Sequence, residues 1–215
     1  DNIYKEVGKG ISNRNNYTRL IGETGGKNFH FVDDSFNSNL EFLADETVQS
    51  AFGYSGQKCS ACSILYLPEN LLDIFIPILK RRINSFMEYN GNYGLINSNS
   101  FKKTLTNINN LKRDTKNIDV LIDTAVEKTK TYHVSPFVVK CSDHNHSVFK
   151  QEYFAPILAI YPYPTSKTKE TLNLCSTANN YALTGSIFST RENFIDHADK
   201  VLKSKTGNFY INCRS

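Results

Sequence analysis

Residues 29–68, FHFVDDSFNSNLEFLADETVQSAFGYSGQKCSACSILYLP, contain two short apolar runs separated by a longer amphipathic segment. The runs, at residues 29–32 and 64–67, have the length and composition of buried strands. Between them, apolar side chains recur at helical spacing over residues 40–52, and this periodicity predicts an amphipathic helix that ends at Gly53. The segment is therefore predicted to fold as strand, helix and strand.

The same alternation continues to the end of the chain, after a polar segment at residues 1–18 that we expect to be a frayed helix and a loop. Further strands are predicted at residues 120–122, 137–140, 156–161, 183–189 and 209–212, and further helices at residues 69–88, 101–111, 167–177 and 191–203. Pro77 is expected to kink or split the helix over residues 69–88. No internal repeat is evident. Strands that alternate with helices predict an α/β fold with an open, mostly parallel sheet and flanking helices.

Composition argues against some classes of partner. The 25 basic and 21 acidic residues give a net charge of +4, which is too small to indicate a nucleic-acid-binding protein. The basic run at residues 80–82 is better explained as a solvated helix face than as a phosphate site. The apolar run at residues 71–79 is interrupted by Asp73 and Pro77, so we expect no membrane span. An odd number of scattered cysteines, five, favours a reducing compartment.

Cys59 is the first candidate for chemistry. Its small neighbours would leave the thiol accessible, and a turn that opens into a helix would supply backbone N–H groups that lower its pKa from about 8.5 toward 7. The alternative from the local sequence is a buried structural cysteine. Cys59 and Cys62 form a single C-x-x-C pair, and no second pair or histidine spacing completes a zinc set. We therefore predict no metal site.

Three further residues carry groups that a catalytic site could use. Glu23 lies in a glycine-rich turn, where it could be a general base if partial burial raised its pKa, although a surface turn residue is the alternative. Glu152 and Phe154 are two residues apart and would face the same side of an extended segment. For these two, the alternatives are a loop salt bridge and a core aromatic side chain.

Together, and in this order, three motifs resemble the aldehyde dehydrogenase superfamily. Glu23-Thr24-Gly25-Gly26-Lys27 resembles the family's Glu-x-Gly-Gly-Lys box. Phe52-Gly53-Tyr54-Ser55-Gly56-Gln57-Lys58-Cys59-Ser60-Ala61 resembles its F-x-x-x-G-Q-x-C signature. Glu152-Tyr153-Phe154-Ala155-Pro156 resembles its E-x-F-G-P box, with Ala155 in place of the common glycine.

The resemblance implies a role for each residue. Cys59 would be the nucleophile, Glu23 the general base, and Glu152 and Phe154 the contacts for the cofactor NAD. The sequences of residues 25–32, 56–63 and 207–212 are similar to those of the mitochondrial Δ1-pyrroline-5-carboxylate dehydrogenases. These enzymes oxidise L-glutamate γ-semialdehyde to glutamate in proline breakdown. In that branch Ser60 would contact the substrate carboxylate, and Cys62 would take no part in the reaction.

The resemblance also implies the context of the chain. Residues 1–23 would be the tail of a nucleotide-binding domain, and residues 24–215 a catalytic domain truncated at its C-terminus. We expect a fragment of a homo-oligomeric enzyme of the mitochondrial matrix that acts on a small-molecule aldehyde, with no nucleic-acid or membrane partner. The separation of Glu23 and Cys59 is slightly longer than usual for the family, which places extra residues near 35–39. An aldehyde dehydrogenase for another substrate and an inactive truncated paralogue remain the alternatives.

Overall fold

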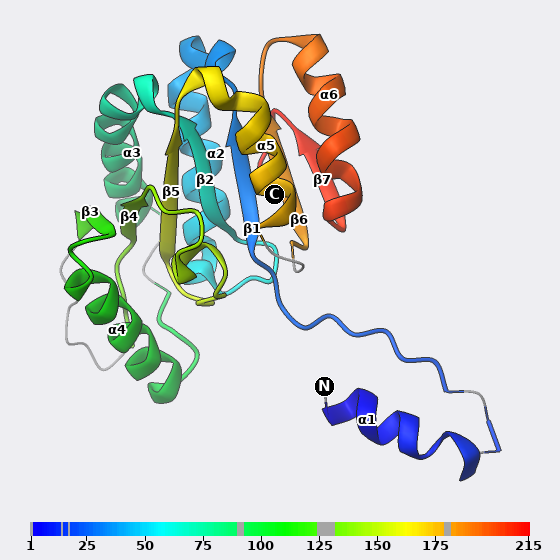
Figure 1. Cartoon of the computed structure of the whole chain (residues 1–215). Coiled ribbons are helices and arrows are strands. Elements are labelled where there is room, and N and C mark those ends of the chain that lie inside the picture. The colour runs from blue at the N-terminus through cyan, green and yellow to red at the C-terminus, as the bar shows by residue number, and fades with distance from the viewer. Residues whose placement is uncertain (1, 14, 17, 90–92, 124–131, 179–181) are drawn as a thin grey trace.

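A computed structural model describes residues 2–13, 15–16, 18–89, 93–123, 132–178 and 182–215. Within these residues the chain forms three layers, with one sheet between two layers of helices (Figure 1). The strands, in chain order, are β1 Asn28–Val32, β2 Cys62–Pro68, β3 Ile118–Asp123, β4 Phe137–Cys141, β5 Ile157–Tyr163, β6 Thr184–Phe188 and β7 Asn208–Ile211. Their spatial order is β3-β4-β5-β2-β1-β6-β7. Every pair of neighbours is parallel except β3 and β4. The predicted fold class is confirmed.

The helices divide between the two faces of the sheet. They are α1 Asn2–Lys9, α2 Leu40–Phe52, α3 Glu69–Tyr89, α4 Ser98–Arg113, α5 Thr168–Thr177 and α6 Glu192–Leu202. One apolar cluster joins α2 and α3 to the sheet, and another joins α4, α5 and α6 to its other face. Figure 1 shows α5 in front of the strands and α2 behind them, while α1 lies apart from both layers. The helical spacing of apolar residues over 40–52 thus supplies the buried face of α2.

Short 3-10 turns complete the connections. They are η1 Ile11–Asn13, η2 Asp34–Asn39, η3 Gly53–Gly56, η4 Ser147–Phe149, η5 Thr165–Lys167 and η6 Lys203–Lys205. Residues 35–39, where the family resemblance places the extra residues, lie in η2 between β1 and α2, and that placement stays a prediction. Residues 18–27 have no regular secondary structure and lead into β1. The division of the chain between residues 23 and 24 stays a prediction.

Pro77 does not split its helix. The prediction allowed a kink or a split, and the structure has one continuous helix, α3, over 21 residues with Pro77 inside it. Proline has no N–H group, so Pro77 cannot donate a helical hydrogen bond to the carbonyl of Asp73, four residues earlier. Both residues are exposed to solvent. Water can therefore satisfy the carbonyl that a proline leaves unpaired, which explains why the helix continues.

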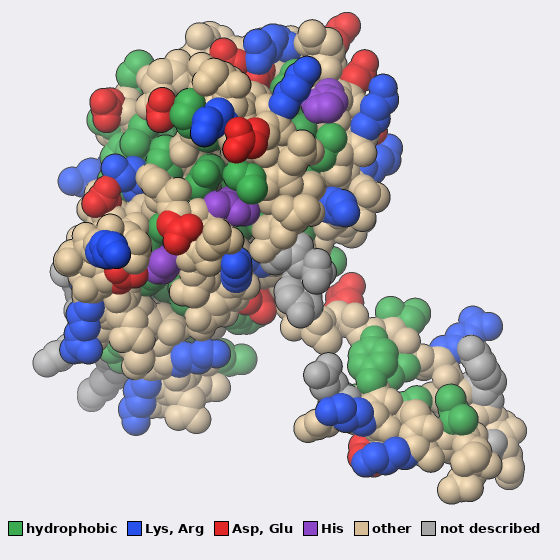
Figure 2. All heavy atoms as spheres, viewed as in Figure 1, with side chains coloured by type: hydrophobic (Ala, Val, Ile, Leu, Met, Phe, Trp, Pro, Cys, Tyr) green, Lys and Arg blue, Asp and Glu red, His purple; other side chains and the backbone are tan. Residues whose placement is uncertain are grey.

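The basic run at residues 80–82 is a solvated helix face, as predicted. Arg82 forms an ion pair with Glu41 at 3.0 Å and with Asp45 at 3.3 Å, and Arg81 also pairs with Glu41. These pairs link α3 to α2. On the face viewed in Figure 2, Lys and Arg side chains are interspersed with Asp and Glu side chains. No helix among the described residues has both the length and the apolar character that a bilayer span requires.

Candidate active site

Parts of all three predicted motifs lie at one edge of the sheet. The Glu23 segment precedes β1, the Cys59 turn precedes β2, and the Glu152 segment precedes β5. Because neighbouring parallel strands begin at the same edge, the three motifs meet there although they are far apart in the chain. We call this the amino edge of the sheet.

The Cys59 thiol is exposed on a tight turn. Residues 58–60 form this turn, which the Ala61 N–H closes by donating to the carbonyl oxygen of Lys58 at 3.0 Å. The turn leads into β2, so the expectation that it opens into a helix is wrong. The expected exposure of Cys59 is confirmed, which removes the alternative of a buried structural thiol. The residues that follow this turn form a strand, and among the described residues the turn does not begin a helix.

Asn28 holds the Cys59 turn in place. Its side-chain N–H groups donate to the carbonyl oxygens of Cys59 at 2.7 Å and of Ala61 at 2.9 Å. Its side-chain oxygen accepts hydrogen bonds from the N–H groups of Leu183 and Thr184, both at 2.9 Å. The Asn28 residue is fully buried, and its bonds to Ala61 and Thr184 are buried, while those to Cys59 and Leu183 are partly buried. One amide therefore joins the Cys59 turn to the beginnings of β1 and β6.

Gly26 allows the two segments to approach this closely. A Cβ atom on Gly26 would collide with the carbonyl oxygen of Cys59. At the neighbouring Gly25, φ is 139°, a backbone conformation that favours glycine, and a Cβ atom there would collide with the carboxylate of Glu152. A side chain at either position would therefore collide with a neighbouring segment, which explains why both residues are glycine.

Glu152 is anchored at the same edge. Its Oε1 accepts a hydrogen bond from the Gly26 N–H at 2.9 Å, and no ion pair of Glu152 is found among the described residues. Phe154 has φ of 51°, in the left-handed region, so the expectation of an extended segment is wrong. The ring is 47% exposed, so it is not a core aromatic side chain. Glu152 and Phe154 nevertheless line one small cavity, of about 20 Å³, together with Lys58.

Lys27 and Cys62 lie beneath this surface. The Lys27 side chain is buried, with its Nζ 5.2 Å from the centroid of the Tyr153 ring. Burial lowers the pKa of Lys27 from 10.5 to about 7, against the opposing influence of Cys62 and Glu152. Burial also raises the pKa of the Cys62 thiol to about 12, so it stays protonated. Cys62 therefore differs sharply from the exposed Cys59, three residues away.

The remaining two predicted residues are less constrained. Glu23 is exposed, so the partial burial expected of a general base is absent in this structure. Ser60 follows Cys59 in the turn, and its carbonyl oxygen accepts a hydrogen bond from the Thr184 hydroxyl at 3.0 Å. Among the described residues, no hydrogen bond joins Glu23 to Cys59.

Comparison with known proteins identifies the family. The family model described as "Aldehyde dehydrogenase family" matches residues 3–215. The chain belongs to the aldehyde dehydrogenase family. Its match to mitochondrial Δ1-pyrroline-5-carboxylate dehydrogenase of Homo sapiens is 36% identical and covers 99% of this chain and 38% of the relative. The protein of the same name from Dictyostelium discoideum is also 36% identical, with the same coverage.

A solved aldehyde dehydrogenase shares the fold. The crystal structure of Δ-pyrroline-5-carboxylate dehydrogenase from Mycobacterium tuberculosis bound with NAD superposes with a TM-score of 0.86 at 28% identity. The superposition covers 99% of this chain and 39% of that one. The chain thus spans about two fifths of the length of the relatives it matches.

Two residues that support the candidate site, Lys27 and Asn28, were not among the predicted ones. Both lie in the stretch 25–32 that resembles the family, but the predicted strand began at Phe29. A polar residue two positions after the Gly-Gly pair, at the first position of β1, was the available signal for Asn28, which is buried. Among the described residues, no group of histidine, cysteine, aspartate and glutamate side chains could hold a metal ion.

Proposed function

We propose that the protein carrying this chain oxidises L-glutamate γ-semialdehyde to L-glutamate with NAD, and that Cys59 is its nucleophile. The exposed thiol of Cys59, on a turn whose backbone Asn28 holds beside the Glu152–Phe154 cavity, is the observation that carries the proposal. The names of the similar proteins support the substrate, because those proteins are Δ1-pyrroline-5-carboxylate dehydrogenases.

The chemistry begins at the Cys59 thiolate. Its sulfur would attack the aldehyde carbon, forming a C–S bond and a thiohemiacetal oxyanion. The backbone N–H of Cys59 would donate to that oxyanion, while Asn28 holds the carbonyl oxygen of the same residue. NAD, when bound, supplies the hydride acceptor that converts the adduct to a thioester.

Glu23 would complete the reaction. Its carboxylate would take a proton from water, and the resulting hydroxide would attack the thioester carbon. The C–S bond then breaks and returns the thiolate of Cys59. Glu23 is exposed in this structure, so we propose that substrate and cofactor cover it when they bind. Ser60, next to Cys59, would contact the substrate carboxylate.

The residues present fit NAD. Gly25 lacks the side chain that would displace the Glu152 carboxylate, and Oε1 of Glu152 is oriented by the Gly26 N–H. Its other oxygen would accept a hydrogen bond from a ribose hydroxyl. The half-exposed Phe154 ring offers an apolar surface for a nicotinamide ring. These two residues would hold the cofactor at the same edge as Cys59.

The names of the relatives support two further parts of the proposal. Several carry the word mitochondrial, which supports the mitochondrial matrix as the location. We also propose a homo-oligomer, as the resemblance implies. The second candidate function is oxidation of another aldehyde, and the third is an inactive paralogue.

The deciding experiment compares three variants of the complete protein. Cys59→Ser should abolish NAD reduction with L-glutamate γ-semialdehyde, Glu23→Gln should reduce turnover by at least about a hundredfold, and Cys62→Ser should largely spare it. Equal loss for the two cysteine variants would refute the nucleophile assignment. Faster turnover on simple aliphatic aldehydes would favour another substrate. No turnover on any aldehyde would favour an inactive paralogue.

A further inference from the structure

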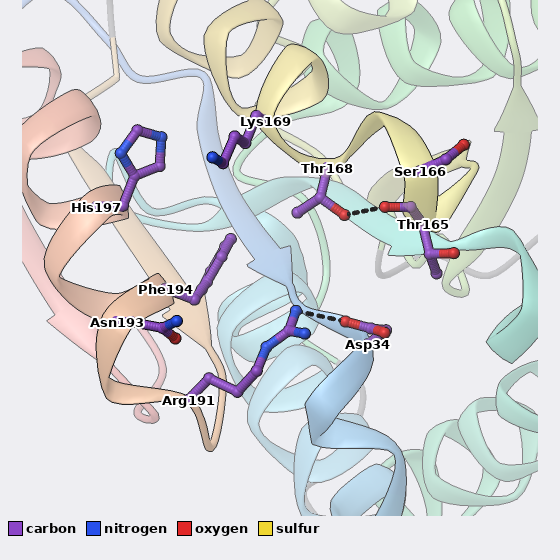
Figure 3. Close-up of a pocket in the computed structure, with 9 residues that line it drawn as sticks. All are labelled: Asp34, Thr165, Ser166, Thr168, Lys169, Arg191, Asn193, Phe194 and His197. Atoms are coloured by element: carbon purple, nitrogen blue, oxygen red, sulfur yellow. Dashed lines mark hydrogen bonds and ion pairs between the residues drawn. The ribbon is translucent and has the colours of Figure 1, made fainter.

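A cavity lies at the opposite edge of the sheet from Cys59. It has a volume of about 690 Å³ and lies between η5, the first turn of α5 and α6, where strands β1, β5 and β6 end (Figure 3). Its walls include Asp34, Thr168, Lys169, Arg191, Phe194 and His197. We call it the carboxyl-edge cavity. Its volume is in the range of small-molecule sites.

Its place in the topology favours a ligand. β1 and β6 are parallel neighbours, but the chain leaves β1 for α2 on one face and β6 for α6 on the other. Between two such strands the carboxyl edge opens into a crevice, and ligands of open α/β sheets commonly bind there. Asp34, just after β1, and Arg191, just after β6, stand on the two sides of this switch point.

One wall of the cavity is rigidly organised. Arg191 Nε donates to Asp33 Oδ2 at 3.0 Å, and its Nη2 donates to Asp34 Oδ1 at 2.6 Å. The Asp33 side chain is fully buried and also accepts a hydrogen bond from the Ser189 hydroxyl at 2.8 Å. The negative charges of this wall are therefore already paired with Arg191, and they repel an incoming anion less than free carboxylates would.

The opposite part of the cavity carries cationic and apolar groups. In Figure 3, Lys169 extends from α5 toward α6, where His197 and Phe194 stand. Lys169 is exposed, and among the described residues it has no ion pair. Phe194 is only 8% exposed and packs against Phe31 of the core, so its ring is a fixed apolar floor.

We propose that the carboxyl-edge cavity binds a small organic oxyanion, a phosphate or a carboxylate attached to an apolar body. Lys169 pairs with the oxyanion, the hydroxyls of η5 donate to it, and the apolar body rests on Phe194. Lys169 supplies the dominant attraction, because it is the cation of the cavity without a carboxylate partner in the described structure. The site is separate from the amino edge, so it is independent of the proposed aldehyde oxidation.

The test is a titration of the isotope-labelled 215-residue chain followed by nuclear magnetic resonance. Phenyl phosphate and benzoate serve as the probes, because they distinguish a phosphate from a carboxylate, and phenol is the uncharged control. At least one anion should produce saturable shifts of the amides at residues 165–169 and 191–197. Lys169→Gln should weaken its binding about tenfold, as expected for the loss of one charge-assisted hydrogen bond.

Lys167→Gln is the matched control. It removes the same charge two residues away, from an exposed side chain that does not line the cavity, and should change the affinity less than about twofold. Several results would overturn the proposal: no saturable shift with either anion, equally tight binding of phenol, equal weakening by the two variants, or shifts confined to the Cys59 turn. The protein spectra of the two variants without ligand show whether each remains folded.

Discussion

The side-chain amide of Asn28 donates a hydrogen bond to the carbonyl oxygen of Cys59 at 2.7 Å, across 31 residues of sequence. The same amide bonds Ala61, Leu183 and Thr184, so it uses both donors and both acceptor sites in a buried position. The Cys59 turn is therefore positioned by the beginning of β1.

Replacing Asn28 with leucine should be strongly destabilising. The Ala61 carbonyl and the Thr184 N–H, which the amide satisfies, would remain buried without partners, those of Cys59 and Leu183 would lose theirs in a partly buried position, and each buried unpaired group costs about 1–3 kcal/mol. We expect the free energy of unfolding, measured by urea denaturation, to fall by at least about 3 kcal/mol. Asn109→Leu, at an exposed position of α4, is the control and should change it by less than about 0.5 kcal/mol. A small change for Asn28→Leu would mean that water or a local shift replaces the amide.

A methyl group at Gly26 should separate β1 from the Cys59 turn. The new Cβ would collide with a backbone oxygen, which cannot rotate away as a flexible side chain can. Gly26→Ala should therefore lower the free energy of unfolding by about 1–3 kcal/mol, as overpacking does. Gly53→Ala is the matched control, because its Cβ would meet only the end of the Lys58 side chain, at 3.4 Å. Equal stability of the two variants would show that the turn can move without cost.

The two cysteines of the C-x-x-C pair should differ in alkylation. Cys59 is exposed, whereas Cys62 is 1% exposed and burial raises its thiol pKa to about 12. Iodoacetamide should modify Cys59 in the native chain and leave Cys62 unmodified until urea is added, as measured by peptide mass spectrometry. Cys213 is also exposed and provides an internal control for reagent access. Native labelling of Cys62 at the rate of Cys59 would contradict the buried position.

His30 should make stability depend on pH. Burial lowers its pKa from 6.5 to about 3, so below pH 6.5 the unfolded chain takes up a proton that the folded chain does not. The contribution of His30 to the free energy of unfolding is therefore complete above pH 6.5. It is lost as the pH falls toward 3, by up to about 1.4 kcal/mol per pH unit.

Urea denaturation at several pH values measures the slope of the free energy of unfolding against pH. His30→Leu should flatten it relative to the unmodified chain. Thr47→Val removes the hydroxyl that lies 3.1 Å from His30 Nδ1 but keeps the imidazole, so the slope should persist in that variant. An unchanged slope in His30→Leu would assign the pH dependence to other groups.

The elements of the fold were predictable from local patterns. The apolar spacing over 40–52 predicted α2. The strand predicted at 64–67 falls inside β2, and the strand predicted at 209–212 overlaps β7. These predictions succeeded because periodicity and turn residues act over a few neighbouring positions. The order of the three motifs identified the family, and their place before parallel strands brought them to one edge. Helix α3 was predicted as an element, but its continuity through Pro77 depended on which side of the helix faces water.

The sequence by itself determined which residues could react, since thiol, carboxylate and glycine chemistry belongs to the residue types. Only the tertiary structure decided their surroundings. Gly26 and Glu152 are 126 residues apart, yet they share a hydrogen bond, and no local pattern encodes that approach. The exposure of Glu23, the left-handed backbone at Phe154, the burial of Lys27 and the Asn28 hydrogen bonds follow likewise from packing between distant segments. Burial and hydrogen bonding depend on which segments the sheet brings together, and this is settled only when the whole domain folds.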